Sequence, residues 1–161
     1  MRSDALFRDD LDRIAFLREL VRAGAKCGWT CIAYCLMTTH YHLVVEVEEG
    51  ALPIGMHAVN SRYAAGFNRR HHTRGHVLEA RYGSHRIGSG AELLGAYAYV
   101  VRNPVAAGLA AHPALWPWSS YWITVATNPS PTFVDAGLVL GGLARTRERA
   151  VAMLRAFVEK S

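Results

Sequence analysis

The apolar residues of this chain recur at helical spacing in several segments. In the first segment, an acidic pair suited to a helix start precedes the apolar positions Leu11, Ile14, Leu17, Leu20 and Val21. We expect this helix to end at Gly24. A second helix is predicted over residues 53–70, with an apolar face formed by Met56, Val59, Tyr63 and Phe67. Steps of three and four place such residues on one side of a helix, where they can enter a core.

Two more helices are predicted in the second half of the chain. One runs from about Ala91 to Asn103 and is followed by Pro104, which we expect to lie beyond its end. The other covers residues 145–159, where charged and apolar positions recur with a helical period. An aromatic cluster at 116–121 and a proline-rich loop at 128–131 lie between them.

Two short segments have the composition of β-strands. Residues 29–37 and 41–47 are rich in β-forming side chains and are separated by a short polar turn, which predicts an antiparallel hairpin. Helices interleaved with antiparallel strands indicate an α+β fold in which helices cover one face of a sheet.

Composition limits the class of protein. A chain of 161 residues suits a single domain, and 51% hydrophobic with 19% charged residues is a globular rather than a disordered balance. The apolar runs are too short to cross a bilayer, and no basic-then-apolar leader opens the chain. We therefore expect a cytoplasmic protein with no membrane partner. The formal charge of +5 permits binding to a polyanion without requiring it.

The three cysteines, Cys27, Cys31 and Cys35, are odd in number and closely spaced. Buried reduced thiols are the favoured interpretation. The alternative is a zinc site that joins them to His40 and His42, although no second cysteine pair stands at zinc-finger spacing.

His40 and His42 flank Tyr41 at the start of the second predicted strand. Side chains alternate along a strand, so residues two apart point the same way and the two imidazoles could hold one cation. A His-x-His pair also arises by chance, and two ordinary strand histidines remain the alternative.

Tyr99 stands apart from the apolar stripe of the helix predicted at 91–103. That stripe is formed by Leu93, Tyr97, Val100 and Val101. Tyr97 is therefore expected in the core. Tyr99 falls on a different face, which it shares with Glu92, Ala96 and Asn103. Surface packing is one explanation for an aromatic residue there, and a phenol placed to attack a docked substrate is the other.

Asn103 lies one helical turn beyond Tyr99 and directly before Pro104. An asparagine at such a place commonly caps or ends a helix. Its amide oxygen could instead complete a site begun by the two histidines. A mixed imidazole and oxygen set suits Mg²⁺ or Mn²⁺ acting on phosphate better than a closed structural zinc.

Five arginines lie at the end of the second predicted helix and after it, interleaved with histidines and a tyrosine. They are Arg69, Arg70, Arg74, Arg81 and Arg86. A run of charge is often only solvated surface. Guanidinium groups beside aromatic and imidazole rings are also what backbone contact and base stacking on single strands require.

Together, these pieces resemble the REP-associated tyrosine transposases, a branch of the single-tyrosine HUH transposases. The matching stretches are 7–10 (FRDD), 33–37 (AYCLM), 40–46 (HYHLVVE), 67–71 (FNRRH), 75–77 (GHV), 81–82 (RY), 99–105 (YVVRNPV), 107–109 (AGL) and 116–121 (WPWSSY). No single stretch is decisive, but the ordered set is specific and extends from about residue 6 nearly to the end of the chain.

The resemblance implies a role for each matching residue. His40 and His42 correspond to the HUH pair that binds a divalent metal, Mg²⁺ or Mn²⁺, and Asn103 to the third ligand position. Tyr99 corresponds to the nucleophile that forms a 5′-phosphotyrosine. The implied substrate is single-stranded hairpin DNA from a repetitive extragenic palindrome, and the five arginines are candidates for holding its backbone. The acting form would be a monomer or a homodimer.

The resemblance also implies a ferredoxin-like antiparallel sheet with helices on one face. Residues 1–125 would form the HUH transposase-like catalytic domain, and 126–161 a C-terminal loop and helical extension packed on it. The family's first strand has no counterpart before Phe7, which would leave unpaired backbone groups beside the hairpin. Two alternatives remain: a truncated, non-catalytic DNA-hairpin-binding protein and a zinc-stabilised interaction domain.

Overall fold

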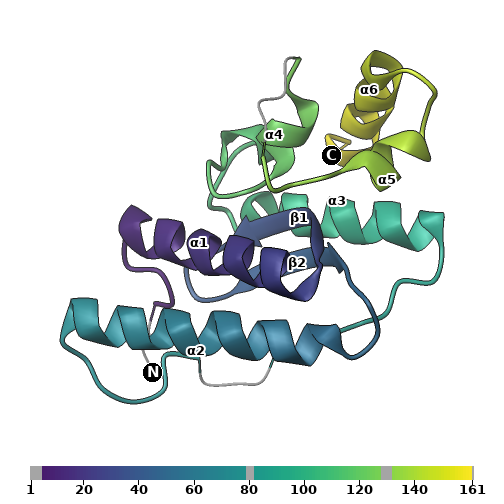
Figure 1. The fold of residues 1–161 in the computed structure, drawn as a ribbon. Coiled ribbons are helices and arrows are strands. Elements are labelled where there is room, and N and C mark those ends of the chain that lie inside the picture. Colours follow the sequence, from purple (N-terminus) through teal and green to yellow (C-terminus); the bar gives the residue numbers. More distant parts are fainter. Residues whose placement is uncertain (1–4, 79–81, 128–131, 161) are drawn as a thin grey trace. The chain divides into compact units, whose positions relative to one another are not determined.

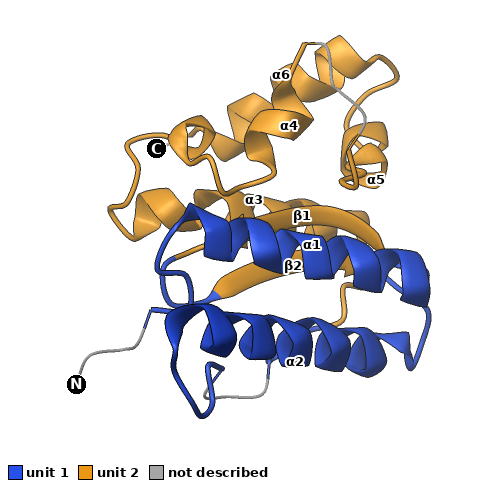
Figure 2. Ribbon diagram, turned by 60° about the vertical axis from the view of Figure 1, so that its left-hand side comes forward, with its two compact units in different colours: residues 1–29, 38–40, 46–85 blue, residues 30–37, 41–45, 86–161 orange. Residues whose placement is uncertain are grey.

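The computed structural model describes residues 5–78, 82–127 and 132–160. Its architecture is α+β, as predicted, with helices and one antiparallel β-hairpin in the sequence order shown in Figure 1. The chain divides into two compact units (Figure 2). Unit 1 contains residues 1–29, 38–40 and 46–85, and unit 2 contains residues 30–37, 41–45 and 86–161.

Unit 1 is built on two helices, α1 (Asp10–Cys27) and α2 (Ala51–His71). Asp9 caps α1, because its carboxylate accepts a hydrogen bond of 3.1 Å from the Asp12 N–H. The helix does not end at Gly24, so that prediction was wrong. It ends at Gly28, whose φ of 69° is left-handed and whose N–H donates to the Gly24 carbonyl. The left-handed position that glycine favours is therefore four residues later than expected.

The face of α1 that enters the core also differs from the prediction. Leu11, Ile14 and Val21 are exposed by 60%, 43% and 42%. The buried positions are Asp12, Arg13, Phe16, Leu20 and Ala23. Two interactions hold this orientation: the Phe16 ring packs edge-on against Phe7 at 5.5 Å between centroids, and the Asp12 carboxylate binds partners on α2. Because α1 buries the paired Asp12 carboxylate, part of its apolar face is exposed to solvent.

The apolar face of α2 is confirmed. Its buried positions include the four that helical spacing predicts, Met56, Val59, Tyr63 and Phe67. The Tyr63 ring contacts both Phe7 and Phe16, and its hydroxyl donates to the Leu6 carbonyl. The segment before α1 is therefore tied into the core of unit 1.

Unit 2 contains the predicted hairpin, with strands β1 (Thr30–Leu36) and β2 (Tyr41–Glu46). Every residue of β1 after Thr30 is buried. The helix α3 (Gly90–Ala106) packs against β1, and both contribute to the core of unit 2.

The edge of β1 opposite β2 carries backbone hydrogen bonds to later parts of the chain. Leu36 N–H donates to the Trp118 carbonyl at 2.8 Å, and Ser120 N–H to the Tyr34 carbonyl at 2.9 Å. Nearer the start of β1, the Asp135 N–H donates to the Cys31 carbonyl at 2.8 Å. This edge of β1 therefore has backbone partners along part of its length, while the unpaired groups expected beside the hairpin from the missing first strand stay a prediction. Among the described residues the sheet has two strands, with isolated bridges at these positions.

The end of α3 differs from the prediction. Pro104 lies inside the helix, which continues to Ala106, rather than beyond its end. A proline this close to the terminus removes only one helical hydrogen bond. Its ring is also fully buried, which offsets that loss. The start of α3 is capped by Ser89, whose hydroxyl accepts from the Glu92 N–H at 3.2 Å.

The remainder of unit 2 consists of short helices and one longer one. They are η1 (Pro113–Leu115), α4 (Tyr121–Val125), α5 (Gly137–Gly141) and α6 (Arg147–Val158). The last confirms the helix predicted at 145–159. Contacts of α6 with α3, α4 and α5 place the described part of 126–161 within unit 2.

Gly55 provides a test of packing in unit 1. A Cβ added there would lie 2.0 Å from Cζ2 of Trp29. We expect Gly55→Ala to lower the free energy of unfolding by about 1–3 kcal/mol, the usual cost of overpacking a core. The matched control is Gly66→Ala in the same helix, where an added Cβ meets no atom within 4 Å. Helix propensity should make that variant about 0.5–1 kcal/mol more stable. Urea denaturation of both variants checks the difference, and equal stability would refute the contact.

Candidate functional site

The two tyrosines of α3 have opposite environments. Tyr97 is 0% exposed and belongs to the core of unit 2, as the spacing predicts. Burial raises the pKa of its hydroxyl well above the usual range, so Tyr97 stays protonated. Tyr99 is 63% exposed. Of the two, only Tyr99 presents a phenol that a large substrate could reach.

Tyr99 contacts one of the predicted metal ligands. The His42 ring, on β2, lies edge-on to the Tyr99 ring with 5.3 Å between centroids and 83° between planes. His42 is half-buried. Residues that are 57 positions apart in the sequence (99 − 42) are thus in direct contact within unit 2.

Asn103 is half-buried on the turn after Tyr99. Its amide nitrogen donates to the Tyr99 carbonyl at 3.1 Å. Since α3 continues to Ala106, Asn103 does not end the helix, and that alternative was wrong. The hydrogen bond uses the nitrogen of the side chain, so the amide oxygen is the atom with ligand chemistry.

His40 belongs to unit 1 and is exposed. Its Nδ1 lies 3.1 Å from the Thr39 hydroxyl oxygen. With Nδ1 engaged in this way, the candidate ligand atom of His40 is Nε2.

The predicted donor set, His40, His42 and Asn103, contains two imidazoles and one amide oxygen. Among the described residues, no three His, Cys, Asp or Glu side chains form a group that could enclose a metal. Two imidazoles and one amide oxygen are too few to close a coordination shell. Mg²⁺ usually retains several waters and takes substrate phosphate oxygens as ligands, so an open set of this kind suits it.

The cysteines favour the reduced-thiol interpretation. Cys31 and Cys35 are buried, Cys27 is half-buried, and all three are free. Burial raises the pKa of both Cys31 and Cys35 to about 12. Zinc binds the thiolate form, which these environments disfavour.

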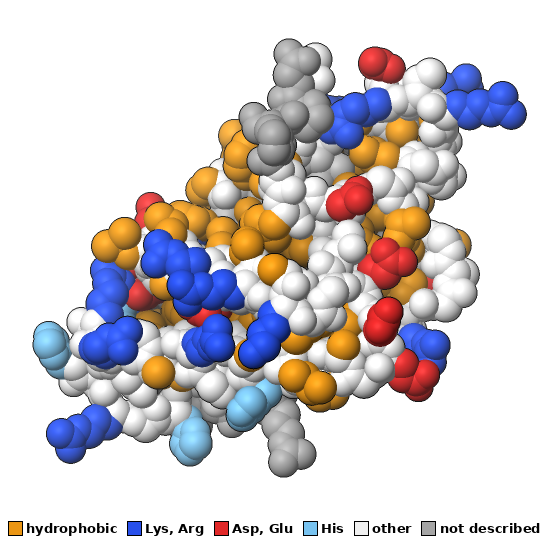
Figure 3. Space-filling model, viewed as in Figure 1, with side chains coloured by type: hydrophobic (Ala, Val, Ile, Leu, Met, Phe, Trp, Pro, Cys, Tyr) orange, Lys and Arg blue, Asp and Glu red, His pale blue; other side chains and the backbone are white. Residues whose placement is uncertain are grey.

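The predicted DNA-binding arginines have different environments. Arg69 and Arg74 are exposed in unit 1, and Arg86 is exposed in unit 2. Arg81 lies outside the described residues. In unit 1, basic side chains gather over α1 and the end of α2 (Figure 3). The exposed members of this basic surface are Arg8, Arg18, Arg22, Lys26, Arg62, Arg69, Arg70 and Arg74.

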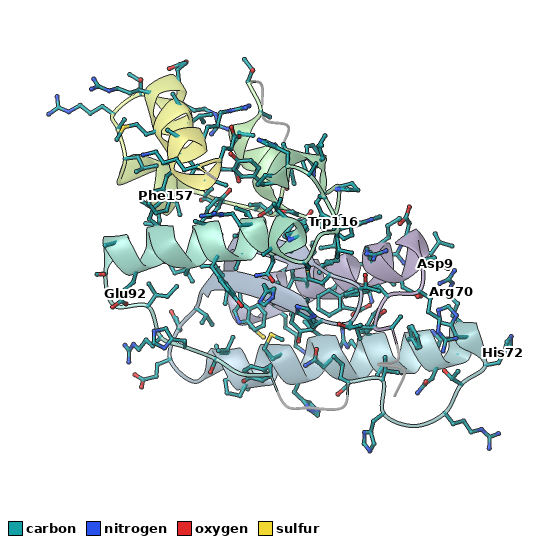
Figure 4. All side chains as sticks on the ribbon, turned by 180° about the vertical axis from the view of Figure 1, so that it is seen from behind. Asp9, Arg70, His72, Glu92, Trp116 and Phe157 are labelled. Carbon is teal, nitrogen blue, oxygen red and sulfur yellow. The ribbon has the colours of Figure 1, made fainter. Side chains whose placement is uncertain are left out.

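Arg70 is engaged in ion pairs that sequence reasoning missed. Its guanidinium contacts the Asp9 carboxylate at 2.6 Å (Figure 4). It also contacts the buried Asp12 carboxylate at 2.5 Å. His71 Nε2 lies 2.8 Å from the same Asp12 oxygen. The hydrogen bond from Arg70 holds the pKa of Asp9 at about 2. The sequence contains an Asp in the first turn of one helix and basic residues in the last turn of the next. It does not show that these residues meet.

Comparisons with protein-family models, with curated proteins and with solved structures found no match. None of the described helices is long and apolar enough to cross a membrane.

The ion pairs predict that Arg70 contributes to stability and that its neighbour Arg69 does not. We expect Arg70→Gln to lower the free energy of unfolding measurably, because it removes a partner of the buried Asp12 carboxylate. The exposed neighbour provides the control: Arg69→Gln should change stability by less than about 0.5 kcal/mol. Denaturation at neutral pH measures both, and equal effects would show that the ion pairs do not stabilise unit 1.

Proposed function

We propose that this protein is a metal-dependent transposase-like endonuclease that nicks and rejoins single-stranded hairpin DNA through a covalent bond to Tyr99. The observation that carries the proposal is the exposed Tyr99 phenol in edge-on contact with the His42 ring. An exposed aromatic residue beside a histidine is poorly explained by core packing. The order of motifs resembling the single-tyrosine HUH transposases supports the same function.

His40, His42 and Asn103 are the residues that would hold Mg²⁺ or Mn²⁺. When bound, such an ion would polarise and orient a phosphate oxygen. Asn103 has a second role that does not involve the ion. Its hydrogen bond to the Tyr99 backbone carbonyl fixes the Asn103 amide against the turn of α3 that carries the nucleophile.

Tyr99 supplies the attacking oxygen. The phenolic oxygen forms a bond to the scissile phosphorus, and the bond from phosphorus to the 3′ oxygen breaks. The phenolic proton ends, in net terms, on that 3′ oxygen. The products are a 5′-phosphotyrosine and a free 3′-hydroxyl, and attack by another 3′-hydroxyl reverses the step without ATP.

The basic surface of unit 1 would bind the phosphate backbone of the hairpin. Arg69 and Arg74 are exposed and have no carboxylate partner among the described residues. Arg70 would have to exchange Asp9 for a phosphate, so it is the weakest of the candidates. The same surface supports the second function, a non-catalytic hairpin-binding protein, which needs the arginines and not Tyr99.

A covalent adduct separates the two functions. We expect wild-type protein mixed with an end-labelled hairpin oligonucleotide and Mg²⁺ or Mn²⁺ to give a protein–DNA adduct on a denaturing gel. Tyr99→Phe should abolish the adduct, because the variant lacks the attacking oxygen. Tyr97→Phe is the matched control on the same helix and should retain it. Hairpin binding without any adduct would establish the non-catalytic function instead.

Removal of the metal provides an independent test. With EDTA, or in His42→Ala, we expect the adduct to be lost, while hairpin affinity falls by less than about tenfold because phosphate contacts supply most of it. Gel-shift titration measures the affinity. Adduct formation that persists in EDTA would contradict the assignment of His40, His42 and Asn103 as metal ligands.

A further inference from the structure

We infer that Arg102 binds the phosphate that Tyr99 attacks, which makes it a catalytic residue that rests on the proposed function. Arg102 follows Tyr99 by three positions on α3. Residues three apart on a helix are surface neighbours, with about 5–6 Å between their Cβ atoms. Both side chains are exposed, and Arg102 flanks Tyr99 on the side opposite Asn103.

The charge of Arg102 is isolated in the sequence. Between Glu92 and Asp135, it is the only Asp, Glu, Lys or Arg residue. A single guanidinium within such a long uncharged stretch, one turn after the candidate nucleophile, is not a typical run of solvated charge.

Arg102 is also not used to hold the fold together. No ion pair joins it to a carboxylate among the described residues. Two other arginines of unit 2 do bind groups of the folded chain. Arg147 donates to the Thr124 carbonyl at 2.9 Å, and Arg155 lies 3.8 Å from the Glu159 carboxylate.

An arginine without a carboxylate partner creates an uncompensated positive potential beside Tyr99, which attracts an anion. The planar guanidinium fork matches two oxygens of a phosphate. The anion of the proposed substrate is a phosphodiester, and Tyr99 must approach its phosphorus. Arg102 can therefore hold two phosphate oxygens while the phenolic oxygen faces the phosphorus.

The Arg102 guanidinium contributes most to the rate in the transition state of the attack by Tyr99. As the bond to the Tyr99 oxygen forms and the bond to the 3′ oxygen breaks, negative charge is spread over the phosphoryl oxygens. A positive group placed there beforehand stabilises the transition state more than the bound substrate. Tyr99 and Arg102 lie on the same helix, so their backbone positions are fixed before DNA binds.

The test measures single-turnover adduct formation at saturating hairpin, together with hairpin affinity. We expect Arg102→Ala to slow adduct formation about 10²-fold, the lower end of the loss when one transition-state donor is removed. Its dissociation constant should rise by no more than about threefold, because one exposed phosphate contact is lost. Arg102→Lys should recover part of the rate, since it keeps the charge without the fork.

The matched control is Arg145→Ala, which removes one exposed charge from unit 2 outside α3. It should leave the single-turnover rate unchanged. Equal rate losses in Arg102→Ala and Arg145→Ala, or a rate loss explained wholly by weaker binding, would overturn the role of Arg102. A wild-type rate in Arg102→Ala would do the same while the proposed function stands. If the wild-type protein itself forms no adduct, the proposed function fails and the role of Arg102 fails with it.

Discussion

The packing of Tyr97 into the core of unit 2 determines what α3 presents to its surroundings. A helix turns by about 100° per residue, so Tyr97 and Tyr99 must point in nearly opposite directions. Tyr97 and Val101 are fully buried, and the cost of exposing them fixes the rotation of α3 about its axis. The exposed position of Tyr99, its contact with His42 and the neighbouring places of Arg102 and Asn103 all follow from that rotation.

The end of α2 is held by charge as well as by the buried Phe67 ring. Asp12 is 2% exposed and accepts bonds from Arg70, from His71 and from the Arg8 N–H. Removing a carboxylate from water is costly, and these partners are what make its burial acceptable. The network joins the first turn of α1 to the last turn of α2 (Figure 4). It thereby fixes the end of α2, after which the chain continues to the exposed Arg74.

The sequence identified the secondary structure well and the tertiary pairings poorly. Periodicity placed α2, α3 and α6, and composition placed both strands. Periodicity also assigned Tyr97 to the core and Tyr99 to a different face. It failed at α1, because an apolar stripe does not reveal that a paired Asp12 is buried in its place. It also failed at the end of α3, where burial of Pro104 overrides the usual stop. The pairing of β1 with residues near 118 and 135 depends on contacts between distant segments, which no local pattern contains.

The pairing of β1 on both edges has a consequence for the order of folding during synthesis. The hairpin emerges from the ribosome early, but the residues that pair with the second edge of β1 are made 82 (118 − 36) to 104 (135 − 31) positions later. Until then, a strand made almost wholly of buried residues has unsatisfied backbone groups along one side. Long-range closure of this kind raises contact order and slows folding. The nascent chain is therefore most vulnerable to aggregation before its C-terminal third has been made.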